Sequence, residues 1–260
     1  RGTAVKELAK GWKQNPDTLP LLKQLIQSDD HWVIRCAALQ ELAQGWKEDP
    51  DTLPLLKQRI QSDDDGFVRG ATVEGLARGW KQDPDTLPLL KQRIQSDDDG
   101  YVRRAALQEL AQGWKEDPDT LPLLKQRIQF DDDGYVRRAA IEELAKGWKE
   151  NPDTLPLLKQ LIQSDDDGSV RRAALQELAK GWKEDPWLFE LLYNCTINDP
   201  FQPDKYREEN IRQTALKIII KRYPDHPKTL TLLRDRAEND ADEKVREFAQ
   251  KKLKQFTQNH

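Results

Sequence analysis

The chain has 260 residues, of which 37% are hydrophobic and 34% are charged, and its formal net charge is −4. This low apolar content is compatible with a disordered chain. The order of the residues must therefore decide whether the chain folds. The longest aliphatic run, Ile218–Ile220, is far shorter than the about 20 apolar residues that span a bilayer. The slightly acidic balance disfavours nucleic acid as a partner. Cys36 and Cys195 form neither a disulfide framework nor a zinc motif, which favours a reducing, cytoplasmic compartment.

The dipeptide Gly-Trp recurs every 34 residues and is the strongest internal signal. Residues 85–118 and 119–152 differ at only five positions. A repeat of this length is one supersecondary unit that stacks on its neighbours. The copies are Gly11-Trp12, Gly45-Trp46, Gly79-Trp80, Gly113-Trp114, Gly147-Trp148 and Gly181-Trp182.

The first half of each unit predicts a helix, over 119–128 in the fourth full copy. Asp119 and Thr120 are candidate capping residues, and Pro122 falls in the first turn, where an N–H lacks an intrahelical acceptor anyway. The apolar stripe is expected to be Leu121, Leu124 and Ile128.

The second half predicts a longer helix from about Tyr135 to Trp148, after the turn Asp131–Gly134. Asp133 is the expected N-cap, and the buried stripe is expected to be Val136, Ala140, Leu144 and Trp148. Neither helix can bury its stripe alone, so neighbouring pairs must stack. The predicted fold is all-α, a right-handed α-solenoid with a 34-residue period.

The same register divides the chain into four parts. Residues 1–16 are expected to be the second helix of a truncated repeat, and 17–186 five regular repeats. Residues 187–227 predict a divergent repeat with a seven-residue insertion, and 228–260 a polar capping repeat. The chain starts at Arg1 without a methionine, so we expect upstream domains of the same chain to precede it.

Residues 97–106, with their copies at 63–72, 131–140 and 165–174, resemble the HEAT-repeat signature. In that family an Asp of the inter-helix turn and an Arg that opens the second helix pair along the stack. The unit also resembles the short arrays at the C-termini of cyanobacterial NACHT-type (STAND-class) signalling NTPases. No phosphate-binding Gly-rich motif occurs in this sequence, so a nucleotide site would lie upstream.

The residues indicate no catalytic site, cofactor or metal. The contiguous Asp clusters lack the alternating ligands of a calcium loop, and helix capping with an Asp–Arg ladder explains them better. His31, His226 and His260 stand alone, and the serines lie near turns without a histidine. The repeated tryptophans favour packing between units, with a ligand-binding aromatic ladder as the alternative.

Two adjacent arginines of each second helix are given different roles. Arg103, Arg137 and Arg171 match the HEAT ladder position and are expected to be structural. The residue after each of these arginines is also an arginine and lies about 100° further round the helix, on its polar face. These three arginines either bind a partner or are merely solvated. We expect partner binding at this face and at aromatic and basic residues of the insertion. The candidates are Arg104, Arg138, Arg172, Gln108, Glu142, Gln176, Phe201, Tyr206 and Arg207.

These features favour a non-catalytic, protein-binding or ligand-sensing scaffold, and the resemblance implies the C-terminal recognition arm of a larger signalling or defence NTPase. The expected partner is an acidic or phosphorylated protein. We expect this chain to make no contact with a membrane and, by itself, to be monomeric. The alternative is a HEAT-like enzyme, of the bilin lyase or nucleic-acid repair type. Its site would lie in 187–227, where the sequence is unique.

Overall fold

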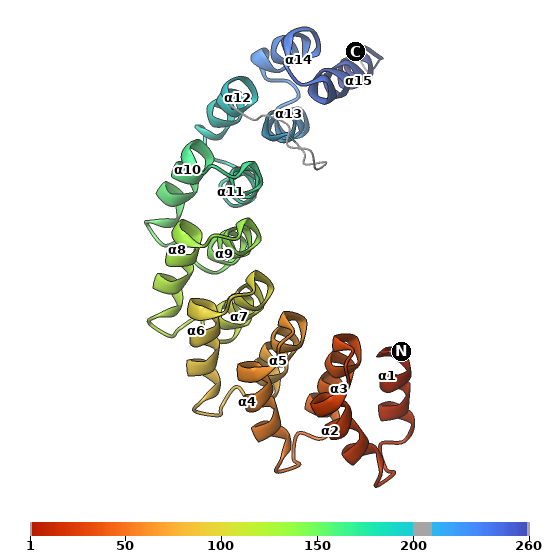
Figure 1. Ribbon diagram of the computed structural model, residues 1–260. Helices are drawn as coiled ribbons and strands as arrows, with labels where there is room; N and C mark the ends of the chain where they lie inside the picture. Colours follow the sequence, from red (N-terminus) through yellow and green to blue (C-terminus); the bar gives the residue numbers. More distant parts are fainter. Residues whose placement is uncertain (1, 200–209, 259–260) are drawn as a thin grey trace. The chain divides into compact units, whose positions relative to one another are not determined.

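The computed structural model describes residues 2–199 and 210–258, and within them the chain forms fifteen α-helices and no strand (Figure 1). This confirms the prediction of an all-α fold built from helix pairs. None of the described helices is long and apolar enough to cross a membrane. The chain divides into two compact units, Arg1–Gly147 (unit 1) and Trp148–His260 (unit 2).

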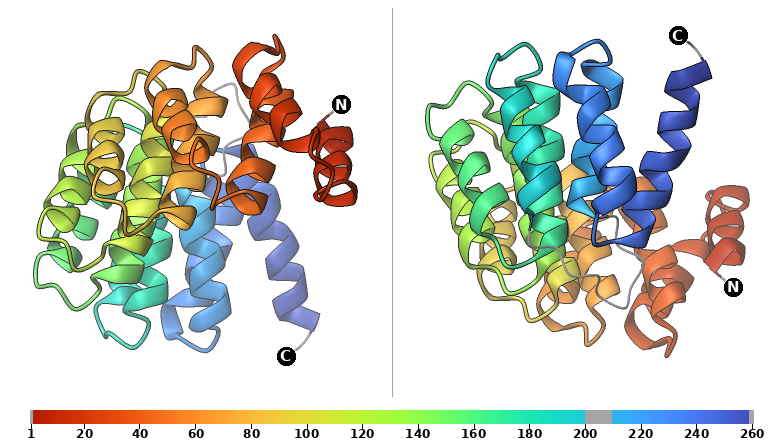
Figure 2. Two further views of the ribbon diagram at one scale, coloured as in Figure 1. Left: turned by 90° about the horizontal axis from the view of Figure 1, so that it is seen from below. Right: turned by 90° about the horizontal axis from the view of Figure 1, so that it is seen from above.

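Unit 1 is a stack of helix pairs in two layers (Figures 1 and 2). Each second helix packs against the first helix of its own pair and against the next second helix. No comparable contact links one first helix to the next, so the second helices form the more closely packed layer. The first helices are α2 (Thr18–Ser28), α4 (Thr52–Ser62), α6 (Thr86–Ser96) and α8 (Thr120–Phe130). The second helices are α1 (Gly2–Gly11), α3 (Trp32–Gly45), α5 (Gly66–Gly79), α7 (Gly100–Gly113) and α9 (Gly134–Gly147).

Unit 2 repeats the plan with three pairs, in which α11 packs on α13 and α13 on α15. The first helices are α10 (Thr154–Ser164), α12 (Leu188–Asn198) and α14 (Pro227–Asn239). The second helices are α11 (Gly168–Gly181), α13 (Ile211–Arg222) and α15 (Glu243–Gln258). Each unit is therefore an α-solenoid.

The first helices begin differently from the prediction. Asp119 occupies the N-cap position of α8, but its side chain accepts no capping hydrogen bond. Its carboxylate lies 2.7 Å from Lys91 Nζ of the preceding repeat, together with that of Asp117. The fully buried Thr120 hydroxyl instead donates to the carbonyl of Trp114 at 2.7 Å. The predicted capping residue therefore links neighbouring repeats.

The predicted N-cap of the second helix is confirmed. Asp133 accepts a hydrogen bond from the backbone N–H of Tyr135 at 2.7 Å, and Asp99 does the same for Tyr101 at 2.8 Å. The Asp133 carboxylate also lies against the start of the preceding second helix. A Cβ added to Gly100 would stand 2.0 Å from Asp133 Oδ2, so the close approach of two repeats requires glycine there.

The core follows the predicted stripes with one shift. Val136, Ala140 and Leu144 of α9 are fully buried, whereas Trp148 is only half-buried. In α8 the buried stripe includes Leu123, Leu124 and Ile128, and Leu121 is half-buried. The fully buried core thus consists of aliphatic side chains, and the tryptophan rings lie at its edge.

Within each unit, buried arginines join successive repeats, as the resemblance to the HEAT signature implies. Arg103 donates from Nε and Nη2 to both carboxylate oxygens of Asp131, at 3.0 and 2.8 Å. Its Nη1 donates to the carbonyl of Asp97 in its own turn, at 2.9 Å. The same ladder contains Arg35–Asp63, Arg69–Asp97, Arg171–Asp199 and Arg212–Asp240.

Replacing the buried Arg103 with glutamine should lower the free energy of unfolding by about 1–3 kcal/mol, because Asp131 loses its two-point partner. Urea unfolding followed by circular dichroism measures the change. The matched control, Arg104→Gln on the same helix, should stay within about 0.5 kcal/mol of wild type. Equal losses for the two variants would contradict the structural role of Arg103.

Acid should weaken the array through the same carboxylates. Burial alone would raise the pKa of Asp97 and Asp131, but hydrogen bonds from Arg69 and Arg103 lower these pKa values below the usual range. A depressed folded-state pKa stabilises the native state above the unfolded-state pKa of about 3.9, and this contribution is lost as the pH falls below it. Urea unfolding between pH 6 and pH 2.5 should show that loss. The double variant Asp97→Asn/Asp131→Asn should be less stable at pH 6 and lose less on acidification; an unchanged acid slope would contradict the assignment.

The glycines at the two ends of α7 provide a matched test of repeat packing. Gly100→Ala should destabilise the protein by about 1–3 kcal/mol, because the new methyl overlaps the carboxylate that caps α9. Gly113→Ala should change stability little, since a Cβ there has only Lys81 Cε within reach, at 3.9 Å. Thermal unfolding of both variants checks this, and a tolerated Gly100→Ala would show that the repeats are not held this closely.

Candidate binding surface on the second helices

The second helices of unit 1 present one exposed face each, and α7 shows how the residues are placed on it. Tyr101, Arg104 and Gln108 are spaced by three and four residues, so they lie on the same side of the helix. All three are half-exposed. Arg103 is one residue away and is buried in the ladder, so adjacent arginines have separate environments.

Aromatic rings stack across three consecutive second helices at this face. The rings of Trp32 and Phe67 are 4.6 Å apart and nearly parallel, and those of Phe67 and Tyr101 are 5.0 Å apart. Trp32 and Phe67 remain 41% and 47% exposed. The sequence reasoning missed these rings, although Phe67, Tyr101 and Tyr135 occupy the same place in consecutive copies and were a usable signal. Trp32 lies one residue before that place in its own copy, where Val33 is the counterpart of Phe67. We call the exposed set the aromatic–arginine row: Trp32, Phe67, Tyr101, Arg104, Tyr135 and Arg138.

A glycine determines how the rings stack. A Cβ added to Gly70 would stand 2.3 Å from Cε1 of Tyr101, so the tyrosine ring lies directly on this glycine. Gly70 is the counterpart of Arg104 in the preceding repeat, so packing against the Tyr101 ring constrains this position there. Beyond Arg104 the next ring, Tyr135, is 63% exposed.

The two arginines of the row lie near aromatic rings rather than carboxylates. Arg104 Cζ lies 5.3 Å from the ring centre of Tyr101, and Arg138 Cζ lies 5.8 Å from that of Tyr135. Among the described residues, no carboxylate forms an ion pair with either guanidinium. Other arginines of unit 1 are paired with carboxylates: Arg35, Arg69, Arg78 and Arg103. The row therefore contains two cationic groups whose charge the described protein does not neutralise.

The remaining predicted binding residues are only partly brought together. Glu142 is exposed on α9. Arg172 and Gln176 lie half-exposed on α11 of unit 2, where Ser169 occupies the tyrosine position. Phe201, Tyr206 and Arg207 lie outside the described residues.

The C-terminal half of the same face is occupied by contacts between helices. Arg78 of α5 donates to Glu109 of α7 at 2.8 Å, and Gln112 of α7 donates to Glu143 of α9 at 3.2 Å. Burial raises the pKa of Glu109, while Arg78 opposes that rise. The polar groups there already have partners, which leaves the N-terminal half as the candidate binding surface.

The repeated tryptophans lie at the other end of each second helix and contact their own chain. Trp80 occupies the C-cap position of α5, and Lys47 Nζ of the preceding repeat lies 5.9 Å from its ring. The same pairing holds for Lys13 with Trp46, Lys81 with Trp114, and Lys149 with Trp182. These rings are half-buried, so their structural role is a cation–π contact between repeats.

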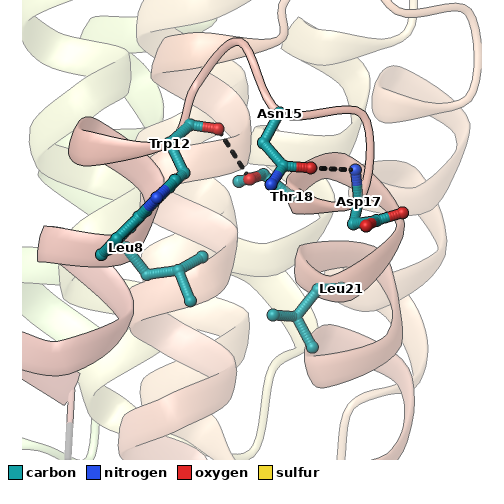
Figure 3. Close-up of a pocket in the computed structure, with 6 residues that line it drawn as sticks. All are labelled: Leu8, Trp12, Asn15, Asp17, Thr18 and Leu21. Atoms are coloured by element: carbon teal, nitrogen blue, oxygen red, sulfur yellow. Dashed lines mark hydrogen bonds between the residues drawn. The ribbon is translucent and has the colours of Figure 1, made fainter.

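Two hollows lie near the N-terminal helices. One, of about 230 Å³, is lined by Trp12, which is 59% exposed, and by residues of the α1–α2 turn (Figure 3). In that turn the Thr18 hydroxyl donates to the Trp12 carbonyl at 2.7 Å. The other, of about 430 Å³, includes Trp32 and Cys36 and adjoins the aromatic–arginine row.

The cysteines and acidic clusters show no activated group. Burial, reinforced by the nearby charge of Asp65, raises the pKa of Cys36 to about 12. The Cys36 thiol therefore stays protonated near neutral pH and is a poor nucleophile. Within residues 2–199 and 210–258, no cluster of three His, Cys, Asp or Glu side chains could hold a metal ion.

Comparison with known proteins agrees with this architecture. The family model described as HEAT repeats matches residues 1–77 and 87–179, which is more than half of the chain. The X-ray structure of YibA from E. coli is similar, with a TM-score of 0.60 and 19% sequence identity over 98% of this chain and 97% of that one. At this identity the likeness shows the fold alone. No curated protein sequence matches the chain.

Proposed function

Because the chain belongs to the HEAT-repeat family, we propose that it is a non-catalytic scaffold that binds a protein partner through its second helices. The observation that carries this proposal is the pair of arginines that lie near exposed tyrosine rings without a described carboxylate. Tyr, Trp and Arg are the residue types that dominate the binding energy of protein interfaces. The neighbouring Asp clusters are already used in caps and in the ladder, which supports a binding role over a catalytic one.

The proposed partner is acidic or phosphorylated. An arginine side chain binds carboxylates and phosphates through two parallel hydrogen bonds, and a nearby ring leaves that edge of the guanidinium available. Such contacts weaken as salt rises, since the row is open to solvent. Gln108, Glu142, Arg172 and Gln176 are proposed to border the contact.

The wider context is also a proposal. The resemblance of the repeat unit to the C-terminal arrays of NACHT-type signalling NTPases supports a recognition arm attached to upstream domains of such a protein. The two free thiols, Cys36 and Cys195, fit a reducing cytoplasm. In that setting this chain contributes contacts, and its parent contributes nucleotide chemistry.

Partner capture by the parent protein tests the binding face. Charge reversal of Arg104, Arg138 and Arg172 to glutamate should reduce capture by roughly tenfold or more, as expected for interface hot spots. The matched control reverses Lys146 and Lys180, which lie on the helices of Arg138 and Arg172, together with Arg78 of α5, the second helix that precedes α7. It changes the net charge equally. A second variant lacks residues 200–207, the predicted insertion. Folding of each is verified by circular dichroism.

Unchanged capture by both the arginine variant and the deletion variant would assign binding to another surface. Equal loss in the arginine variant and in its charge-matched control would mean that overall charge, rather than the row, drives the interaction.

A further inference from the structure

The aromatic–arginine row has a spacing that selects one kind of ligand. Its members lie on successive second helices, which pack at about 8–10 Å between axes. A polyproline II segment advances about 3.1 Å per residue, so three residues cover about 9 Å and return to the same side of the segment. One turn of such a segment therefore matches one repeat.

The chemistry of the row fits that conformation. The stacked rings of Trp32 and Phe67 cover part of each other's faces, but 41% and 47% of these residues remain exposed. The exposed parts of the rings offer an apolar surface of the kind that proline rings pack against. Arg104 and Arg138 follow on the next two second helices, one repeat apart and without a described carboxylate. Two carboxylates three residues apart in a polyproline II segment would face both guanidinium groups at once.

We propose that the row binds a proline-rich, extended peptide that carries two acidic residues three positions apart. The prolines pack on Trp32, Phe67 and Tyr101, and the carboxylates pair with Arg104 and Arg138. This inference rests on the proposed function and specifies its ligand. Single-stranded nucleic acid could also stack on aromatic rings, but the chain has a net charge of −4, which opposes a polyphosphate.

The test measures fluorescence anisotropy of a labelled, short, proline-rich peptide with two aspartates three residues apart. Control peptides carry the aspartates two residues apart, or two asparagines in their place. We expect the first peptide to bind at least about fivefold more tightly than either control at low salt. Arg104→Gln and Arg138→Gln should each weaken it by about three- to fivefold, as expected for a partly exposed ion pair.

Three further variants distinguish damage to the row from changes elsewhere on the same helix. Gly70→Ala should displace the Tyr101 ring and weaken peptide binding by several-fold. Gly79→Ala, on the same helix, should not, because a Cβ there meets only the Ala43 carbonyl oxygen, at 3.9 Å. Arg78→Gln removes a positive charge that is already paired with Glu109, and it should leave binding unchanged.

Equal binding of the three peptides, or tighter binding of a short oligothymidine, would overturn the inference. If no peptide binds while charge reversal still abolishes partner capture, the proposed function stands and this ligand assignment fails. If neither experiment responds to the arginines, both fail.

Discussion

The buried arginine–aspartate pair between successive repeats is the interaction on which the rest of the array depends. Arg103 donates to three of the oxygen atoms around it: the carbonyl oxygen of Asp97 in its own turn, and both carboxylate oxygens of Asp131 in the next. Removing these charges from water is costly unless every partner is present, so the pair fixes the register of neighbouring helix pairs. That register brings the capping carboxylate of one repeat onto the first glycine of the preceding second helix.

Two adjacent arginines of one helix have different roles, one in holding the repeats together and one in the proposed binding surface. Arg103 is buried at the contact with the next repeat, while Arg104 lies about 100° further round the helix, near the half-exposed ring of Tyr101. Because the ladder determines the spacing of the second helices, it also sets the distance between successive exposed arginines. The binding surface that we propose is thus a product of the contacts that hold the repeats together.

Periodicity made much of this fold predictable, because each copy repeats the same constraints. The 34-residue period indicated the helix pairs, the position of Asp133 before the second helix indicated its N-cap, and the resemblance to the HEAT signature implied the Asp–Arg ladder. The failures lie where one repeat meets the next. Asp119 was expected to cap a helix but pairs with Lys91, and the constraint that the Tyr101 ring places on Gly70 was not predicted. Such contacts join residues about 30 positions apart, and no local pattern reports them. The recurrence of Phe67, Tyr101 and Tyr135 every 34 residues could have indicated the aromatic row, but the stacking of Trp32, which lies outside that register, on Phe67 could not be read from the sequence.

A double-mutant cycle between Arg103 and Asp131 tests the central claim most directly. Unfolding free energies are measured for Arg103→Met, Asp131→Leu and the double variant, with Arg104→Met replacing Arg103→Met in a parallel cycle. The ladder predicts a coupling energy above about 1 kcal/mol for Arg103 with Asp131, and additivity within about 0.5 kcal/mol for Arg104 with Asp131. Additive effects in the first cycle would show that the pair does not hold the repeats in register.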